Sequence, residues 1–246
     1  MARLFVPPER AAGAAIVLAG DEHRYVCRVL RLGEGDRLTL FDGCGNECDV
    51  RLSRVGTREA HAVVEGRRAR ATRQRPAVTL LIGLCKGERM DFVVQKATEL
   101  GAARVIPVET VRSVPRLEAE RARGRLARWG TIAREAARQC GRADALTLGE
   151  IQPFEAALAA VQDAPLKVLF WEEASAPLRD LAPPLPPAAA AVAVGPEGGF
   201  TPGEVAAARA AGFAVTSLGP RILRAETAAV VALALLGYVA GDLGGP

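Results

Sequence analysis

A glycine-rich segment, Val194-Gly-Pro-Glu-Gly-Gly-Phe200, is suited to close contact with a ligand. Glycine has no Cβ, so its backbone can turn tightly and approach a bound molecule. Thr201, Pro202 and Glu204 follow in the order of an N-cap, a first helical residue and a capping-box acid. A glycine loop that leads into a helix can hold a phosphate, a carboxylate or a nucleoside, although ordinary structural turns have the same pattern.

A second segment has a similar composition and reads Leu218-Gly-Pro-Arg-Ile-Leu-Arg-Ala-Glu-Thr-Ala228. Its glycine-proline pair predicts a turn. Glu226 falls in the first turn of the helix that follows, where the helix dipole favours an acid for structural reasons alone. The acid, together with Arg221, Arg224 and the turn, nevertheless indicates a ligand-binding cleft beside the first loop.

The familiar nucleotide-binding motifs are missing from the sequence. No Gly-x-Gly-x-x-Gly fingerprint follows a first strand, and no Gly-x-x-x-x-Gly-Lys-Ser/Thr phosphate loop occurs. Gly195 also lies late in the chain, whereas those loops usually follow the first strand of their domain. An α/β nucleotide enzyme of another type remains an alternative that these absences disfavour.

The cysteines predict neither disulfides nor a metal site. They stand at positions 27, 44, 48, 85 and 140, an odd number with irregular spacing. Cys44 and Cys48 form the one close pair, and His23 and His61 belong to no companion ligand motif. We expect reduced thiols and no bound metal.

Two stretches of the chain are strongly basic. Residues 1–75 carry a net charge of +4. The stretch from Arg112 to Arg142 contains nine arginines and only three glutamates. Such stretches can follow a phosphate backbone, and the pI near 9.0 agrees with a nucleic-acid partner. A run of charge is, however, often only a solvated face.

The elements that must position these residues fall into two groups. The first seventy residues predict short strands and one helix, which together fit a small β-barrel-like domain. The strands are Ala15–Leu18, Arg37–Phe41, Cys48–Leu52 and Ala60–Val64, the second and third being joined by a hairpin over Asp42–Asn46; the helix covers Asp21–Leu32. An arginine-rich link, Gly66–Pro76, follows.

After Pro76, apolar strands alternate with helices, which predicts an α/β domain on a largely parallel sheet. The strands are Val78–Leu84, Arg104–Val108, Lys167–Trp171, Ala190–Val194 and Ala214–Leu218; the helices run from about Arg89 to Gly101, Leu117 to Cys140, Pro202 to Ala211 and Ala225 to Ala240. A proline-rich loop contains Pro183, Pro184, Pro186 and Pro187. Both glycine loops therefore lie at the carboxyl ends of strands, where open α/β sheets bind ligands.

The chain is expected to be cytoplasmic. Its first residues lack the apolar stretch of a signal peptide. The most apolar run, Thr227–Ala240, is too short to span a bilayer and is typical of a core helix.

The sequence resembles the RsmE family of small-subunit (16S) ribosomal RNA uracil-N3 methyltransferases, within the SPOUT superfamily. Six segments carry the resemblance in order along nearly the whole chain: the two glycine loops, His23-Arg-Tyr-Val-Cys-Arg-Val-Leu-Arg31, Leu40-Phe-Asp-Gly43, Gln95-Lys-Ala-Thr-Glu-Leu-Gly101 and Gln139-Cys-Gly-Arg142. The combination is highly specific, because chance would not place six such segments together.

The resemblance implies a fold with two domains. Residues 1–72 would form a PUA-like β-barrel that binds RNA, and residues 73–246 a SPOUT methyltransferase domain with a carboxyl-terminal trefoil knot. It also implies a homodimer. The sequence pattern alone would have predicted an ordinary Rossmann-like sheet, because true knots are rare.

The resemblance further implies that S-adenosylmethionine (SAM) is the methyl donor and that no metal is needed. Backbone groups of three segments would hold it: the end of strand Leu169–Trp171, Gly195–Gly199 and Leu218–Leu223. The cofactor-binding candidates are Leu169, Val194, Gly195, Glu197, Gly198, Gly199, Leu218, Gly219, Ile222 and Leu223, of which Leu218, Ile222 and Leu223 would offer an apolar face.

Methyl transfer to N3 of a uridine requires alignment of two reactants and removal or tolerance of the imide proton. We expect Arg224, Arg142 and Arg3 to stabilise charge on the uracil oxygens or to contact phosphate. Glu197 and Glu226 are candidates for a base or for orienting those arginines, and a purely structural Glu226 is the alternative. The catalytic candidates implied by the match are Arg224, Glu226, Arg142, Gln139 and Glu197.

The sequence departs from the family at Arg138, where glutamate is common before the Gln-x-x-Arg pattern. Glu135, Arg138 and Arg142 would share one helix face if the helix continued to Arg142. In SPOUT dimers this region approaches the partner's cofactor site, so the active site could be composite. The RNA-binding candidates are Arg3, Arg24, Arg28, Arg31 and Arg138. Arg24, Arg28 and Arg31 would form one stripe on the predicted helix that faces RNA; the alternative, that they are ordinary solvated surface arginines, fits the sequence equally well.

A non-catalytic RNA-binding or ribosome-assembly module is the competing interpretation. It would use the same β-rich domain and the same basic stretches. It predicts RNA binding without SAM binding, and it leaves both glycine loops unexplained.

Overall fold

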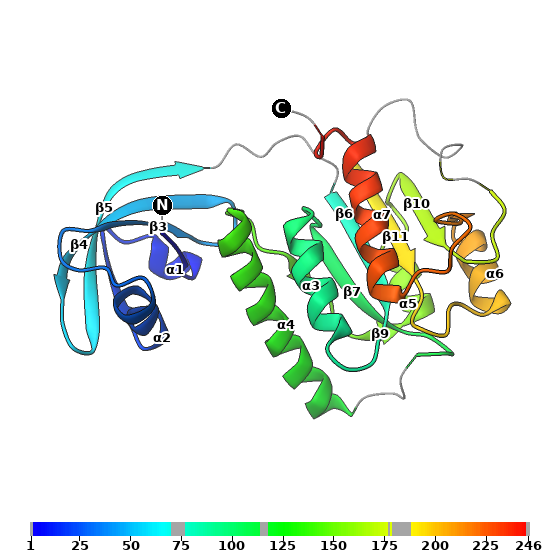
Figure 1. The fold of residues 1–246 in the computed structure, drawn as a ribbon, viewed down its shortest axis with the longest axis horizontal. Helices are drawn as coiled ribbons and strands as arrows, with labels where there is room; N and C mark the ends of the chain where they lie inside the picture. The colour runs from blue at the N-terminus through cyan, green and yellow to red at the C-terminus, as the bar shows by residue number, and fades with distance from the viewer. Residues whose placement is uncertain (1, 70–76, 114–117, 177, 179–187, 245–246) are drawn as a thin grey trace. The chain divides into compact units, whose positions relative to one another are not determined.

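The computed structural model describes residues 2–69, 77–113, 118–176, 178 and 188–244. The chain forms two compact units, which are described separately: Met1–Thr72 with Arg134–Ala145, and Arg73–Ala133 with Leu146–Pro246 (Figure 1). The long helix α4 (Ala119–Cys140) contributes to both. The domain boundary expected after residue 72, the end of the arginine-rich link and the proline-rich loop lie outside the described residues, so that boundary stays a prediction.

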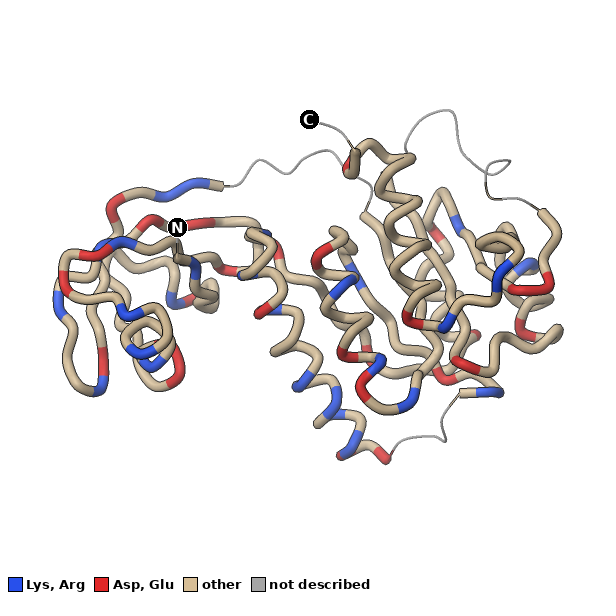
Figure 2. Tube along the Cα trace, in the orientation of Figure 1, with Lys and Arg blue, Asp and Glu red and all other residues tan. Residues whose placement is uncertain are grey.

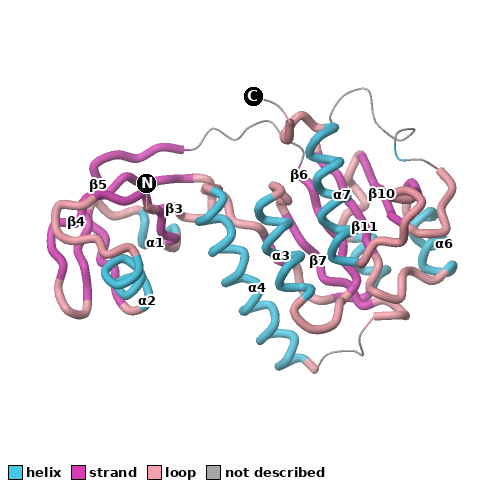
Figure 3. The backbone as a smooth tube through the Cα atoms, viewed as in Figure 1, coloured by secondary structure: helices cyan, strands magenta, loops and turns pink. Residues whose placement is uncertain are grey.

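The first unit is built on a five-stranded sheet. Its strands are β1 (Arg3–Phe5), β2 (Ala15–Ala19), β3 (Arg37–Phe41), β4 (Asn46–Val55) and β5 (Glu59–Ala69), in the order β1-β3-β4-β5-β2. β1 is parallel to β3, and the other pairs are antiparallel. Figure 3 shows β3, β4 and β5 of this sheet in magenta. The Asp42 carboxylate accepts hydrogen bonds from the amides of Cys44 and Asn46 and closes the turn between β3 and β4. The four expected strands and the hairpin are confirmed.

The helix expected over Asp21–Leu32 is shorter and less regular than predicted. Helix α2 (Asp21–Arg24) continues as the π-helical turn η1 (Tyr25–Val29), in which the Leu30 amide donates to the Tyr25 carbonyl. Arg31 lies beyond the helix with a φ of 56°. The expected stripe of three arginines is therefore wrong, because the wider π turn changes the spacing and Arg31 is not helical.

The second unit contains a parallel sheet. Its strands are β6 (Ala77–Gly83), β7 (Arg104–Glu109), β8 (Thr147–Leu148), β9 (Gln152–Pro153), β10 (Leu166–Phe170), β11 (Ala189–Val194) and β12 (Ala214–Thr216). The order is β12-β10-β11-β6-β7-β8, with β9 also paired to β7. Apolar side chains run continuously along β6 and β11, as expected for parallel strands buried on both faces.

Helices cover both faces of this sheet. Alternate strand residues point to opposite faces. Val168 and Phe170 lie in the core with α3 (Arg89–Glu99), α7 (Ala225–Val239) and Trp129 of α4. Leu169 points the other way, into the core with α5 (Phe154–Ala159) and α6 (Pro202–Ala210). The α/β expectation is confirmed, and β1, β8, β9, α5 and the short α1 (Pro8–Ala11) are elements that the sequence pattern missed.

Among the described residues, none of the helices combines the length and the apolar character needed to cross a membrane.

Candidate functional site

A pocket of about 770 Å³ lies at the carboxyl ends of β10, β11 and β12 in the second unit. Phe170, the last residue of β10, and Val194, the last residue of β11, line this pocket. The two glycine loops form much of the wall, through Gly195, Pro196, Glu197 and Gly199 from the first and through Leu218–Arg224 from the second. The structure thus brings together two segments that the sequence singled out separately.

The glycines of the first loop have close neighbours. A Cβ on Gly195 would lie 3.1–3.2 Å from backbone atoms of Gly199 and Phe200. Gly199 has a φ of 68°, and a Cβ there would lie 2.4 Å from a carboxylate oxygen of Glu172. A Cβ on Gly83, beneath the loop, would lie 2.4 Å from Pro196. The loop is therefore a tight turn that larger residues could not form without rearrangement.

Hydrogen bonds to the helix that follows and to the segment after β7 anchor this loop. The predicted capping box is present: the Thr201 hydroxyl accepts from the Glu204 amide, and the Glu204 carboxylate accepts from the Thr201 amide at 2.8 Å. The buried Glu204 also accepts from the Val111 amide at 2.9 Å, and the Arg112 guanidinium donates to the Gly198 carbonyl at 3.0 Å. The segment after β7 thus holds the glycine loop and the start of α6.

Glu197 is held by cationic and amide donors. Its carboxylate accepts from the Lys86 amide at 2.9 Å and from the Arg89 guanidinium. Burial alone would raise the pKa of Glu197, but the Lys86 amide and Arg89 outweigh burial and hold that pKa below its ordinary value. Because a lowered pKa makes it a weaker base, Glu197 is better suited to orienting Arg89 than to accepting a proton.

Glu226 is a second carboxylate near Arg89. Its Oε1 is 3.8 Å from the Arg89 Nε, and its side chain is 15% exposed. Its Oε2 is buried without a hydrogen-bond partner among the described residues. Since a buried carboxylate oxygen without a partner is costly, this atom is a candidate for contact with a ligand. The thiol of Cys85 is not a candidate nucleophile, because burial raises its pKa to about 12.

A second, open pocket of about 750 Å³ adjoins the first. Arg89 and Arg224 line both pockets, whereas Glu226 lines only the second. The other polar residues of this second pocket include Lys86 and Thr227. Arg224, Glu226 and Glu197 therefore lie around two adjoining pockets, as the sequence suggested.

The structure does not bring every predicted cofactor residue into the first pocket. Leu169 is fully buried on the opposite face of the sheet, and Gly198 is exposed outside the pocket lining. Trp171 ends the predicted cofactor segment Leu169–Trp171 and does line the pocket. The Trp171 Nε1 is buried without a partner among the described residues. Glu172 also lines the pocket, although it was not predicted. Its position directly after that segment was the signal available for finding it.

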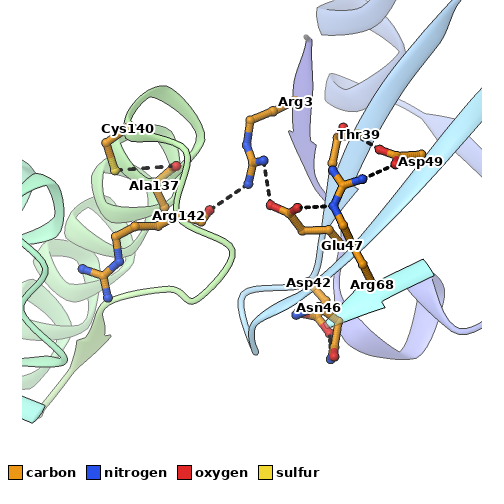
Figure 4. Close-up of polar contacts among 10 residues, drawn as sticks. All are labelled: Arg3, Thr39, Asp42, Asn46, Glu47, Asp49, Arg68, Ala137, Cys140 and Arg142. Atoms are coloured by element: carbon orange, nitrogen blue, oxygen red, sulfur yellow. Dashed lines mark hydrogen bonds and ion pairs between the residues drawn. The ribbon is translucent and has the colours of Figure 1, made fainter. Parts of the chain in front are cut away.

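Arg3 and Arg142 lie in the first unit and are engaged there. The Arg3 guanidinium is 2.7 Å from the Glu47 carboxylate and donates to the Arg142 carbonyl at 3.1 Å (Figure 4). The buried Arg142 side chain points away from Arg3 and pairs with Asp144 at 2.7 Å. The expected face of Glu135, Arg138 and Arg142 is wrong, because α4 ends at Cys140 and Gly141 turns the chain with a φ of 80°.

The remaining arginines of the first unit differ in exposure. Arg24 is exposed at the end of α2, Arg28 is exposed in the π turn η1, and Arg31 is exposed beyond that turn. Arg138 pairs with Glu135, and its guanidinium lies 3.9 Å from the Tyr25 ring centroid. Gln139 is exposed at the end of α4. Further basic residues recur along the amino-terminal half of α4 (Figure 2).

Within the ranges that the structure describes, no group of three or more metal-ligating side chains is found.

The families and proteins that this chain matches agree with one another. The family described as RNA methyltransferase domain matches residues 73–237, and the family described as RNA methyltransferase PUA domain matches residues 18–65. The chain is 33% identical to ribosomal RNA small subunit methyltransferase E of Bacillus subtilis, over 90% of this chain and 89% of that protein. It is 34% identical to the protein of the same name from Mycobacterium tuberculosis, over 92% and 87%.

A solved structure supports the same relationship. The crystal structure of ribosomal RNA small subunit methyltransferase E from Neisseria gonorrhoeae bound to S-adenosyl methionine matches with a TM-score of 0.87 and 32% identity. The match covers 99% of this chain and 99% of that chain. The similarity therefore includes both units of the molecule.

Proposed function

Because the chain belongs to the family of ribosomal RNA small subunit methyltransferase E, we propose that it transfers a methyl group from SAM to small-subunit ribosomal RNA. We further propose that the acceptor is N3 of a uridine. The observation that carries the proposal is the pocket formed by the two glycine loops at the carboxyl ends of parallel strands.

The residues present fit SAM. Gly195 and Gly199 allow the tight turn that shapes this wall, since a Cβ on Gly195 would lie 3.1–3.2 Å from the loop's own backbone and Gly199 has a φ of 68°. Leu218, Leu223 and Ile222 offer apolar surface, and Ile222 is 87% exposed in the pocket wall. The buried Trp171 Nε1 and the nearby Glu172 add a donor and an acceptor for a polar ligand. Of the predicted cofactor residues, Val194, Glu197 and Gly219 also line this pocket.

When bound, SAM supplies an electrophilic methyl group on a sulfonium. The protein must then align the acceptor nitrogen and manage its proton. We propose that Arg224 stabilises negative charge on the uracil oxygens and that Glu197 orients Arg89. Glu226 is the candidate that takes the imide proton or holds Arg89, since its Oε2 lacks a partner among the described residues.

The first unit and part of α4 are proposed to bind RNA. The PUA family match and the exposed Arg24, Arg28 and Arg31 support this role. The other candidates for RNA binding are Arg3, Arg138, Gln139 and Arg142. Two of them also make contacts within the unit, since Arg3 donates to the Arg142 carbonyl and Arg142 pairs with Asp144. Cationic groups of this kind give salt-dependent affinity for a phosphate backbone.

Four further features are proposed from family membership. They are a division into domains 1–72 and 73–246, a trefoil knot in the second, a homodimer and a cytoplasmic location. The chain runs from β11 past β10 to β12, and this crossover is where the proposed knot would form.

The test mixes the protein and labelled SAM with small ribosomal subunits that lack base methylation, followed by digestion of the RNA to nucleosides. We expect the label in 3-methyluridine. Label in another nucleoside would keep the enzyme class and overturn the target. Absence of label, with no SAM binding by calorimetry, would favour the non-catalytic RNA-binding module.

A further inference from the structure

The second pocket is placed to receive the methyl acceptor. Arg89 and Arg224 line it and also line the glycine-loop pocket. A molecule bound in the second pocket would therefore meet the first pocket across these two side chains. Because methyl transfer requires donor and acceptor in contact, an acceptor site must adjoin the donor site in this way.

The chemistry of the second pocket suits a single nucleotide. Lys86, Arg89 and Arg224 supply positive charge, and Thr227 supplies a hydroxyl. Glu226 brings the buried Oε2 that has no partner among the described residues. Sites for unpaired nucleotides combine such cations with an aromatic ring on which the base stacks.

Phe92 provides that aromatic ring. It lies on α3 and lines the second pocket, and its side chain is 43% exposed. The neighbouring α3 residues Met90 and Val93 are buried in the core, so Phe92 is directed away from it. The Lys96 Nζ lies 5.9 Å from the ring centroid, and its charge is paired with the Glu99 carboxylate at 2.8 Å.

From these contacts we propose that the second pocket holds the unstacked acceptor nucleotide, with its base stacked on Phe92 and its phosphate near Lys86. This assignment rests on the proposed function and names the acceptor site within it. It also explains why an aromatic side chain remains exposed on a helix whose other apolar residues are buried.

The first experiment compares Phe92→Ala, Phe92→Tyr and the wild type. The matched control is Tyr238→Ala, which removes an exposed aromatic ring of α7 that lines neither pocket. For Phe92→Ala we expect kcat/KM for small subunits to fall roughly 5- to 100-fold, the loss typical of one stacked base. SAM affinity, measured by calorimetry without RNA, should not change. Phe92→Tyr should restore kcat/KM, and Tyr238→Ala should match the wild type.

Other results would overturn the assignment. An unchanged kcat/KM in Phe92→Ala would remove the ring from the acceptor site. A changed SAM affinity would place Phe92 at the donor pocket, and a changed sedimentation coefficient would make it a contact between protein chains. If the wild type binds no SAM and methylates nothing, the proposed function itself fails. The results given above for the variants all leave a wild type that binds SAM and methylates RNA, so the two kinds of failure can be told apart.

A second readout does not depend on methylation. Small-subunit RNA containing 5-iodouridine should crosslink to Phe92 on irradiation, because the halogenated base reacts with an aromatic side chain stacked on it. Mass spectrometry would locate the crosslink on the protein. Crosslinks confined to other residues would overturn the stacking assignment.

Lys86→Met tests the phosphate contact. The Lys86 amide that binds Glu197 is retained, so only the side-chain charge is lost. We expect weaker RNA binding and a plot of log affinity against log salt that is less steep by about one unit. An unchanged slope would exclude a phosphate contact at Lys86.

Discussion

Single residues decide whether the first glycine loop can form its tight turn. Gly195 faces backbone atoms of Gly199 and Phe200 at 3.1–3.2 Å from its missing Cβ. Gly195→Trp should therefore abolish SAM binding, measured by calorimetry, while RNA affinity stays nearly unchanged. Gly203→Trp is the matched control, since Gly203 is exposed and a Cβ there has no neighbour closer than 4.0 Å. Normal SAM affinity in a folded Gly195→Trp protein would remove this loop from the site.

The Glu197 carboxylate links charge to stability. Its pKa is lowered in the folded protein, so its contribution is present above its unfolded pKa and is lost as the pH falls through the folded value. Glu197→Gln should lower the free energy of unfolding by about 1 kcal/mol at pH 7. The difference from the wild type should shrink below about pH 4.

Urea unfolding at pH 7 and at pH 3 measures the difference in unfolding free energy between Glu197→Gln and the wild type. The exposed Glu150→Gln serves as the control for loss of a surface charge. A penalty for Glu197→Gln that is the same at pH 7 and pH 3 would contradict a role for the ionised carboxylate.

At the scale of elements, Glu204 joins three segments: the glycine loop, the start of α6 and the residues after β7. It accepts hydrogen bonds from the Thr201 amide and hydroxyl and from the Val111 amide. Glu204→Ala removes the acceptor of all three donors and should cost about 1–3 kcal/mol of unfolding free energy. It should also weaken SAM binding, because the loop loses its anchor. Arg209→Ala, an exposed change on the same helix, should alter neither measurement.

The contacts of Arg138 separate a structural role from an RNA role. Its guanidinium stacks on Tyr25 and pairs with Glu135 within the first unit. Arg138→Ala should lower the free energy of unfolding by about 1 kcal/mol through loss of the cation–π contact. If Arg138 also binds phosphate, the salt dependence of RNA affinity should become less steep by about one unit. A lower stability with an unchanged salt slope would make the residue purely structural.

Sequence patterns predicted the long elements and missed the short ones. β6 and β11 could be predicted because strands buried on both faces are continuously apolar. The six-residue α5 and the two-residue β8 and β9 are too short to show a period. The π turn at Tyr25–Val29 depends on tertiary packing, so nothing in the local spacing reveals it.

The candidate site was predicted where the loops themselves carry the signal. Gly195, Glu197 and Arg224 stand in recognisable segments and do line the pocket. Leu169 was misplaced because the strand pattern does not say which face of a sheet lies toward the ligand, and the alternation turns this residue to the opposite core. Glu172 was missed because a single residue after a strand has no motif.

At the scale of the whole molecule, the proposed homodimer would make the active site composite. Gln139 is exposed at the end of α4, and we propose that this region approaches the partner's SAM pocket. The chain has a mass of 25.9 kDa, so sedimentation should give about twice that value.

Mixed dimers test whether the partner supplies Gln139. Gly195→Trp removes the donor pocket and Gln139→Ala the partner's contribution, so each protein alone should be inactive. When the two are unfolded together and refolded at equal amounts, half of the dimers contain one chain of each kind. In those dimers the intact pocket faces the intact Gln139, and methylation should recover to about a quarter of the wild-type rate. A monomeric protein, or one in which Gln139 serves its own pocket, would show no recovery, because neither chain would then hold a complete site.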